Sequence, residues 1–320
     1  MIDAMTVQRT LCKLSYWSGK CDGNLADPTF RDALKRFQQD VGLTADGWYG
    51  AKSDAVVGAY VGQLDQAPAA LKQCRRWRLT VYYLAEEALY PGAKDTPIPD
   101  VNGNALAKVS AGAYAAAALE GTIKMNDGRL LNVAGRVVPV SGAKAAAYDG
   151  VFAIAKKNGW VPDKVGYTGL RLDAAGAVAA VCAFAEVPAG KIGLGYGTGR
   201  GGVPYTPFRT VAADVGAYGP RTKLPSEPRF YGKGGVSPPG TRAFIADWVG
   251  VRLPDGTTHD GFFTVNDTGG AIFGAHFDVF GGTKSLYEKE LKNLRRWPSR
   301  GHVWFEGIEE KLPVTYSYGI

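Results

Sequence analysis

The spacing of the apolar residues changes near residue 78, and this change divides the 320-residue chain into two kinds of structure. Before it, four apolar side chains follow the i, i+4, i+7, i+11 spacing of one helix face: Phe30, Leu34, Phe37 and Val41. From Arg78 onward the apolar segments are short, rich in β-branched and aromatic residues, and separated by turn residues, which is typical of strands. The sequence therefore predicts a multidomain α + β protein, in which a small helical module precedes a mainly-β part.

The helix around Phe37 has recognisable ends. Asp27 is suited to cap its N-terminus, and Pro28 fits the first helical position because that position needs no N–H donor. Gly42 is the expected stop signal, since glycine adopts the left-handed conformation that ends a helix at low cost.

The motifs around this helix resemble the peptidoglycan-binding type 1 domain, a three-helix module. The matching positions are Tyr16, Gly19, Asp22, Gly23, Phe37, Gln38, Gly42, Leu43, Asp46, Gly47 and Gly50. Ser53 departs mildly from the pattern, because threonine is common there. The resemblance implies that this module binds the cell wall, and the candidate wall-binding residues are Tyr16, Asp22, Asp46, Trp48 and Tyr49.

The stretch "VNDTGGAIFGAHFDVFGG" places Asp267 and Asp278 in an apolar, glycine-rich setting. Taken singly, an aspartate beside glycine is most often a turn former. The "DTG" is not that of a pepsin-like protease, which needs two such loops where this chain has one. A metal site is not expected either, because the histidines (His259, His276 and His302) show no HExxH or other paired ligand spacing.

The same stretch resembles the signature of the three-aspartate (3D) domain and the C-terminal end of the membrane-bound lytic transglycosylase A family. Asp214 falls where the first of the three aspartates is expected. The resemblance implies a double-psi β-barrel with an inserted β-rich subdomain. It also implies cleavage of the β-1,4 bond between N-acetylmuramic acid and N-acetylglucosamine, with Asp278 as single general acid/base and Asp267 assisting it.

In that reaction the C6 hydroxyl of muramic acid attacks C1, which gives a 1,6-anhydro sugar without a second carboxylate or a cofactor. A general acid must hold its proton near neutral pH, and the apolar neighbours of Asp278 favour this. Two alternatives stay open: a hydrolytic muramidase on the same scaffold, and a cell-wall-binding protein without catalytic activity.

Further residues are candidates for substrate binding. They are Glu120, Tyr82, Tyr218, Trp248, Gly269 and Gly270. The simpler interpretation of Glu120 is a solvated surface loop, since it lies in a polar, glycine-containing segment. For each aromatic residue the simpler interpretation is core packing.

The predicted boundaries place the wall-binding module at 1–62, a linker at 63–77 and the catalytic part at 78–320. Within the catalytic part we expect the 3D core at about 203–306 and the inserted subdomain at about 105–195.

The net charge of +7 fits an anionic partner such as the cell wall, or simple solubility. No basic stripe with interleaved aromatics suggests nucleic acid, and no apolar run suggests stable membrane insertion. We expect a monomer whose partner is the peptidoglycan glycan strand, acting in the periplasm or outside the cell. No secretory signal is evident in the sequence, so release by a phage or delivery by a secretion system is expected.

The chain has four cysteines, which show no CxxC spacing. Cys12 and Cys21 lie close enough in sequence to bridge, and free thiols are the alternative.

Overall fold

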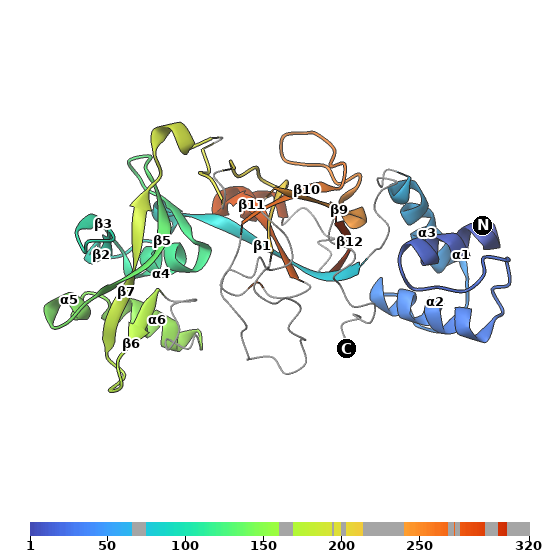
Figure 1. Cartoon of the computed structure of the whole chain (residues 1–320), viewed down its shortest axis with the longest axis horizontal. Coiled ribbons are helices and arrows are strands. Elements are labelled where there is room, and N and C mark those ends of the chain that lie inside the picture. Colours follow the sequence, from blue (N-terminus) through green and yellow to red (C-terminus); the bar gives the residue numbers. More distant parts are fainter. Residues whose placement is uncertain are drawn as a thin grey trace.

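The computed structural model describes residues 1–65, 75–159, 169–193, 195–199, 203–213, 240–267, 272, 276–291 and 300–305. Three parts lie in a row along the long axis of the molecule (Figure 1). Helices α1–α3 form one end, a six-stranded ring lies in the middle, and a second sheet with its helices forms the other end. In the part of the chain that is described, no helix has the length and apolar character needed to cross a membrane.

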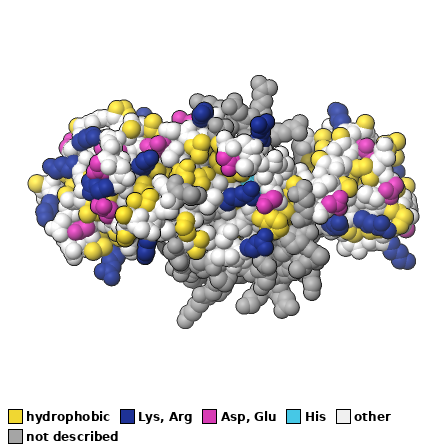
Figure 2. Space-filling model, turned by 90° about the horizontal axis from the view of Figure 1, so that it is seen from above, with side chains coloured by type: hydrophobic (Ala, Val, Ile, Leu, Met, Phe, Trp, Pro, Cys, Tyr) yellow, Lys and Arg dark blue, Asp and Glu magenta, His cyan; other side chains and the backbone are white. Residues whose placement is uncertain are grey.

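Positive charge is spread along the molecule. Figure 2 shows Lys and Arg side chains on the face over all three parts. The net charge of +7 nevertheless comes from the rest of the chain, because residues 1–65 hold seven Lys and Arg against eight Asp.

The N-terminal part contains α1 (Ala4–Lys13), α2 (Pro28–Asp40) and α3 (Ala51–Leu64). The predicted start of α2 is confirmed, because the Asp27 carboxylate accepts hydrogen bonds from the backbone N–H groups at 29 and 30, and Pro28 begins the helix. The predicted stop is confirmed as well, since Gly42, with a φ of +75°, lies two residues after the end of the helix. The predicted face is confirmed too, since Phe30, Leu34 and Phe37 are fully buried.

Two glutamines each fasten an Asp-Gly turn in this part. Gln8 donates to Asp22 and accepts from the N–H of Gly23, whose φ is +86°. Gln38 repeats the arrangement with Asp46 and with Gly47, whose φ is +72°. Only glycine adopts such a φ at low cost, so the turns explain both glycines.

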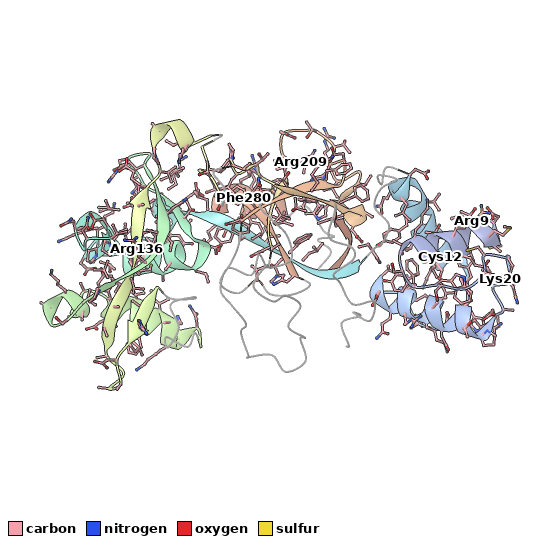
Figure 3. The ribbon with its side chains drawn as sticks, in the orientation of Figure 1. Arg9, Cys12, Lys20, Arg136, Arg209 and Phe280 are labelled. Atoms are coloured by element: carbon pink, nitrogen blue, oxygen red, sulfur yellow. The ribbon has the colours of Figure 1, made fainter. Side chains whose placement is uncertain are left out.

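Six strands form the middle part: β1 (Arg75–Glu86), β8 (Thr210–Ala212), β9 (Thr241–Ile245), β10 (Phe262–Asp267), β11 (His276–Thr283) and β12 (Arg300–Phe305). Their order is β11-β8-β10-β9-β12-β1, and β1 also pairs with β11, so the strands close into a ring. Apolar side chains fill it, among them Phe263, Val265 and Phe277. Phe280 of β11, labelled in Figure 3, belongs to a smaller apolar cluster beside the ring.

The far end of β1 continues into a second sheet. Its other strands are β4 (Thr122–Lys124), β5 (Leu130–Pro139), β7 (Val178–Glu186) and β6 (Leu170–Leu172), joined in that order. A separate pair is formed by β2 (Thr96–Pro99) and β3 (Ala105–Val109), and the helices are α4 (Ala111–Glu120), α5 (Ala143–Ala146) and α6 (Asp149–Lys157). A further helix, α7 (Lys284–Leu291), follows β11. The second sheet has its own apolar core around Tyr114 and Phe184.

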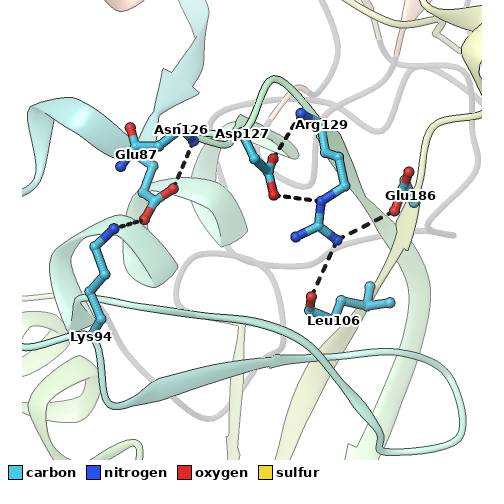
Figure 4. A network of polar contacts seen from close by, with 7 residues as sticks. All are labelled: Glu87, Lys94, Leu106, Asn126, Asp127, Arg129 and Glu186. Carbon is cyan, nitrogen blue, oxygen red and sulfur yellow. Dashed lines mark hydrogen bonds and ion pairs between the residues drawn. The ribbon is translucent and has the colours of Figure 1, made fainter.

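A polar network fastens the turn between β4 and β5 (Figure 4). The buried carboxylate of Glu87, just after β1, accepts from Lys94 at 2.6 Å and from the N–H of Asn126 at 2.8 Å. On the other side of the turn, Arg129 donates to Asp127 and Glu186. The end of β1 is thereby tied to the second sheet.

The helical part packs directly against the ring. Its core continues into Phe244, Ala246 and Val249 of the ring. Tyr60 of α3 donates a 2.6 Å hydrogen bond to the buried carboxylate of Asp247. Since α3 runs to Leu64 and β1 begins at residue 75, the predicted linker at 63–77 overlaps both elements, and its residues 66–74 lie outside the described part of the chain.

Candidate functional site

Neighbouring strands bring two of the three predicted aspartates together. Strand β8 lies between β10 and β11, and Ala212 of β8 is the backbone partner of both Asp267 and Asp278. The N–H of Ala213 also donates to the carbonyl of Asp267. Asp214 is the next residue along the chain and lies outside the described residues.

Thr80 of β1 holds the carboxylate of Asp278. The two residues are opposite one another in the parallel β1–β11 pair, and the Thr80 hydroxyl donates to Asp278 Oδ1 at 2.7 Å. His276 lies two residues before Asp278 and so on the same face of β11, and its Nε2 is 2.7 Å from Thr80 Oγ1. Because one hydroxyl donates only once, Thr80 accepts from Nε2–H of His276 while it donates to Asp278.

Tyr82 holds the other carboxylate. It follows Thr80 by two residues on β1, and its hydroxyl donates to Asp267 Oδ2 at 2.8 Å. Burial, and then the charge of Asp267, raise the pKa of Tyr82 well above its ordinary value, so Tyr82 stays a donor. Asp278 also contributes to this rise, so both carboxylates act on one hydroxyl.

Aromatic rings pack beside the two aspartates, around Phe280 of β11. The ring of Phe280 contacts three tyrosine rings, with centroid distances of 5.0 to 5.6 Å: Tyr82, Tyr196 and Tyr205. Phe280 is 1% exposed. An apolar wall thus stands two residues beyond Asp278 on the same strand, as the sequence predicted.

The interpretation of Glu120 as a solvated loop residue is wrong. Glu120 is the last residue of α4, and its Oε2 accepts a 3.3 Å hydrogen bond from the N–H of Tyr83. Burial raises the pKa of Glu120 to about 8, and the charge of Asp278 contributes to the rise, against the opposing effect of Lys284. Glu120 is therefore mainly protonated at neutral pH.

Trp248 is not a surface for stacking sugars. It is 1% exposed and lies in the ring's core, where it packs edge-on against Phe263 and beside Phe208. The simpler interpretation, core packing, is the right one. The other predicted substrate-binding residues, Tyr218, Gly269 and Gly270, lie outside the described residues.

Four of the five predicted wall-binding residues use their side chains in hydrogen bonds within the protein. Asp22 and Asp46 hold the two Asp-Gly turns, and the hydroxyl of Tyr49 donates to Asp54. The hydroxyl of Tyr16 donates to Asp40 and lies 3.0 Å from Nε2 of His302 in the ring. Trp48 differs, because it is 63% exposed.

Sequence reasoning missed Thr80 and the role of His276. Thr80 lies in a strand that the β-branched pattern predicted, but nothing in a strand pattern identifies its partner 198 residues away. His276 was considered only as a metal ligand. Its position two residues before Asp278, on the same face of a strand, was the signal that could have placed it beside the acid.

Two family models match separate parts of the chain. Residues 234–292 match the 3D domain, which includes Asp267 and Asp278. Residues 3–52 match the peptidoglycan binding domain, which includes α1 and α2. Both resemblances found in the sequence are therefore confirmed.

The fold was also compared with solved structures. Escherichia coli MltA with bound chitohexaose shares 17% sequence identity, with 72% of each chain covered and a TM-score of 0.40. A membrane-bound lytic murein transglycosylase from Agrobacterium tumefaciens shares 14% identity, with 78% of this chain and 83% of that chain covered and a TM-score of 0.35. The lytic transglycosylase LtgG of Burkholderia pseudomallei shares 16% identity, with 86% and 88% covered and a TM-score of 0.33. No curated protein matched the sequence. At these sequence identities and TM-scores, the role of a residue in those structures is not transferred to this chain.

Proposed function

We propose that this protein cleaves the β-1,4 bond between N-acetylmuramic acid and N-acetylglucosamine in peptidoglycan, with Asp278 as the general acid/base. One observation carries the proposal. Within the region that matches the 3D domain, Asp267 and Asp278 are both partners of Ala212, and a hydroxyl of β1 holds each carboxylate. The match to a peptidoglycan binding domain in the N-terminal part supports the same polymer as substrate.

The contacts support specific roles in this reaction. Thr80 donates to Oδ1 of Asp278, and the proton for the glycosidic oxygen is proposed to be carried by Oδ2. Proton transfer breaks the C1–O4 bond and leaves positive charge near C1, which the carboxylate of Asp278 stabilises. Asp278 then takes the proton of the C6 hydroxyl as that oxygen attacks C1, so the proton balance closes without water.

The state of Glu120 favours the anhydro product over hydrolysis. A hydrolytic enzyme needs a second carboxylate that activates water. Glu120 is an acidic group that interacts with Asp278, but its pKa of about 8 leaves most of it protonated at neutral pH, so that only a minor fraction is available as a base. Asp267 accepts a hydrogen bond from Tyr82 at Oδ2, which stabilises its charged form and so weakens it as a base. We therefore propose a lytic transglycosylase rather than a muramidase.

For the fold, we propose that the closed six-stranded ring is a double-psi β-barrel and that the elements from β3 to β7 belong to an insertion between β1 and β8. The supporting observation is the order of the strands, since β1 pairs with both β11 and β12 and then continues into the second sheet through β4. The module at 1–62 and the catalytic part at 78–320 are proposed as the two functional units, with the inserted subdomain at about 105–195.

Trp48 is proposed as a contact with the wall. Its ring is exposed, and the guanidinium of Arg31 lies 4.0 Å above the ring centroid. An exposed aromatic ring suits the face of a sugar, and Arg31 beside it suits the carboxylates of peptidoglycan. With this contact, the proposed setting is the cell wall, reached by phage-type release or by a secretion system, and the proposed state is a monomer.

The test is mass spectrometry of the soluble fragments from purified peptidoglycan. We expect muropeptides that end in 1,6-anhydromuramic acid, and we expect Asp278→Asn to release none. Fragments heavier by one water, with reducing ends, would instead establish a muramidase. If the unchanged protein releases no fragments, the catalytic proposal is wrong and a wall-binding protein is left.

A matched variant separates chemistry from folding. Asp255→Asn changes an exposed aspartate that caps its own turn through Thr257, and it should keep the full lytic rate. Asp278→Asn should still bind purified walls in a sedimentation assay, because the N-terminal part is unchanged. Full activity of Asp278→Asn would mean that another residue is the acid.

A further inference from the structure

Two thiols face each other in the N-terminal part. Cys12 lies near the end of α1 and is labelled in Figure 3, and Cys21 directly precedes the Asp22–Gly23 turn. Their Sγ atoms are 3.7 Å apart, and both residues are half-buried free cysteines. A disulfide has an S–S distance of about 2.05 Å, so the two sulfur atoms, now 3.7 Å apart, must still approach one another for the bond to form.

The segment between these cysteines docks the helical part on the ring. Tyr16 lies within it, and the Tyr16 hydroxyl donates to Asp40 at 2.7 Å and lies 3.0 Å from Nε2 of His302. The ring of Tyr16 also packs edge-on against Phe37 and His302. A covalent link between residues 12 and 21 would therefore also restrain part of the contact between the helical part and the ring.

We propose that Cys12 and Cys21 are an oxidative modification site, and that a disulfide between them closes a covalent loop around the docking residue Tyr16. The oxidant is a disulfide, either a small molecule or a protein. Attack by one cysteine thiolate on that disulfide releases one thiol of the oxidant and leaves a mixed disulfide. The second cysteine then displaces the other half, so the chain loses two hydrogens and the oxidant becomes two thiols.

The surroundings of Cys12 and Cys21 allow oxidation, whereas those of Cys182, the other described cysteine, do not. Cys182 is 3% exposed in the core of the second sheet, where the Tyr114 hydroxyl contacts its Sγ, and no oxidant reaches it. Cys12 and Cys21 are reachable and 3.7 Å apart. Burial and then the neighbouring Cys21 raise the pKa of Cys12 to about 11, so the reduced pair exchanges slowly at neutral pH and faster at higher pH.

The disulfide also suits the proposed place of action. Outside the reducing cytoplasm, disulfides form and persist. A small helical unit gains more from a covalent link than a large core does, because it buries less surface. The inference does not depend on the catalytic assignment, since its readouts are a bond and a melting temperature.

The test is peptide mapping of the full-length chain. The protein is treated with oxidised glutathione at pH 8.5, its remaining thiols are blocked under denaturing conditions, and trypsin is added. Cleavage follows Arg9, Lys13, Lys20 and Arg31, so the two cysteines fall in the peptides TLCK and CDGNLADPTFR. We expect these peptides as one covalent species, two hydrogens lighter than their sum, and we expect Cys182 to be blocked as a thiol.

The second readout is thermal stability. The loop that a disulfide closes between residues 12 and 21 should raise the melting temperature of the oxidised chain by about 5 °C over that of the reduced chain. Cys12→Ser and Cys21→Ser are matched controls, and neither should show a shift on oxidation. Two blocked peptides, a lasting glutathione adduct on either cysteine, or a linked pair without a shift in melting temperature would each overturn the proposal.

Discussion

Removal of the Thr80 hydroxyl is the sharpest test of how the acid is held. Thr80→Val keeps the shape of the side chain, and valine suits a strand as well as threonine does. It removes two contacts of 2.7 Å, one to Asp278 Oδ1 and one to Nε2 of His276. The carboxylate of Asp278 then loses the donor that fixes its orientation toward the glycosidic oxygen.

The size of the effect follows from the kind of hydrogen bond. A hydrogen bond to a charged group contributes about 1.5–3 kcal/mol. Since about 1.36 kcal/mol corresponds to a tenfold change in rate, the lytic rate should fall by about 10- to 160-fold. The reaction forms a carboxylate on Asp278 as the proton leaves, so the loss should appear in kcat more than in KM.

The assay is the initial rate of fragment release from purified peptidoglycan, with circular dichroism as a check of folding. Thr80→Ser is the matched control, because it retains the hydroxyl, and it should stay within about threefold of the unchanged enzyme. A Thr80→Val variant that keeps its rate within about twofold would refute the positioning role. Equal losses in the valine and serine variants would assign the effect to packing instead.

Two further predictions concern stability. Because the folded-state pKa of Glu120 is raised from 4.5 to about 8, its contribution to the free energy of unfolding is full below pH 4.5 and is lost as the pH rises to 8. Glu120→Gln should therefore match the unchanged protein in urea unfolding at pH 4.5 and exceed it at pH 8 by on the order of 3 kcal/mol; parallel pH profiles would contradict this. Tyr60→Phe keeps the ring contacts with Phe37 and His302 but removes the hydrogen bond to the buried Asp247. It should lower the free energy of unfolding by about 1.5–3 kcal/mol in the same assay. An unchanged free energy of unfolding would mean that this hydrogen bond does not hold the two parts together.

Local patterns predicted much of the fold. The face and both ends of α2 follow from apolar spacing, an N-capping aspartate and a glycine stop, which act over a few residues. The strand nature of β1, β10 and β11 follows from their β-branched and aromatic residues. Trp248 shows the limit of such patterns, because the short turn of residues 246–248 carries this side chain into the core.

The site was only partly predictable, for a physical reason. Asp267 and Asp278 stand in one motif, so a local signature finds them. Their partners Thr80 and Tyr82 come from a strand about two hundred residues earlier, and no local property of β1 reveals that it lies beside β11. The protonated state of Glu120 depends on its burial in the assembled structure, which a polar sequence context did not suggest.

The position of β1 in the closed ring also bears on how the chain folds during synthesis. Strand β1 is made early, but two of its partners, β11 and β12, come last among the described strands. Its far end pairs with β4 much sooner, so the second sheet can assemble while the near end of β1 still lacks neighbours. We expect slow closure, because contacts of long sequence separation form late. Until then the edges of β1 are open to pairing with other chains, and the strand that carries Thr80 and Tyr82 is among the last to be completed.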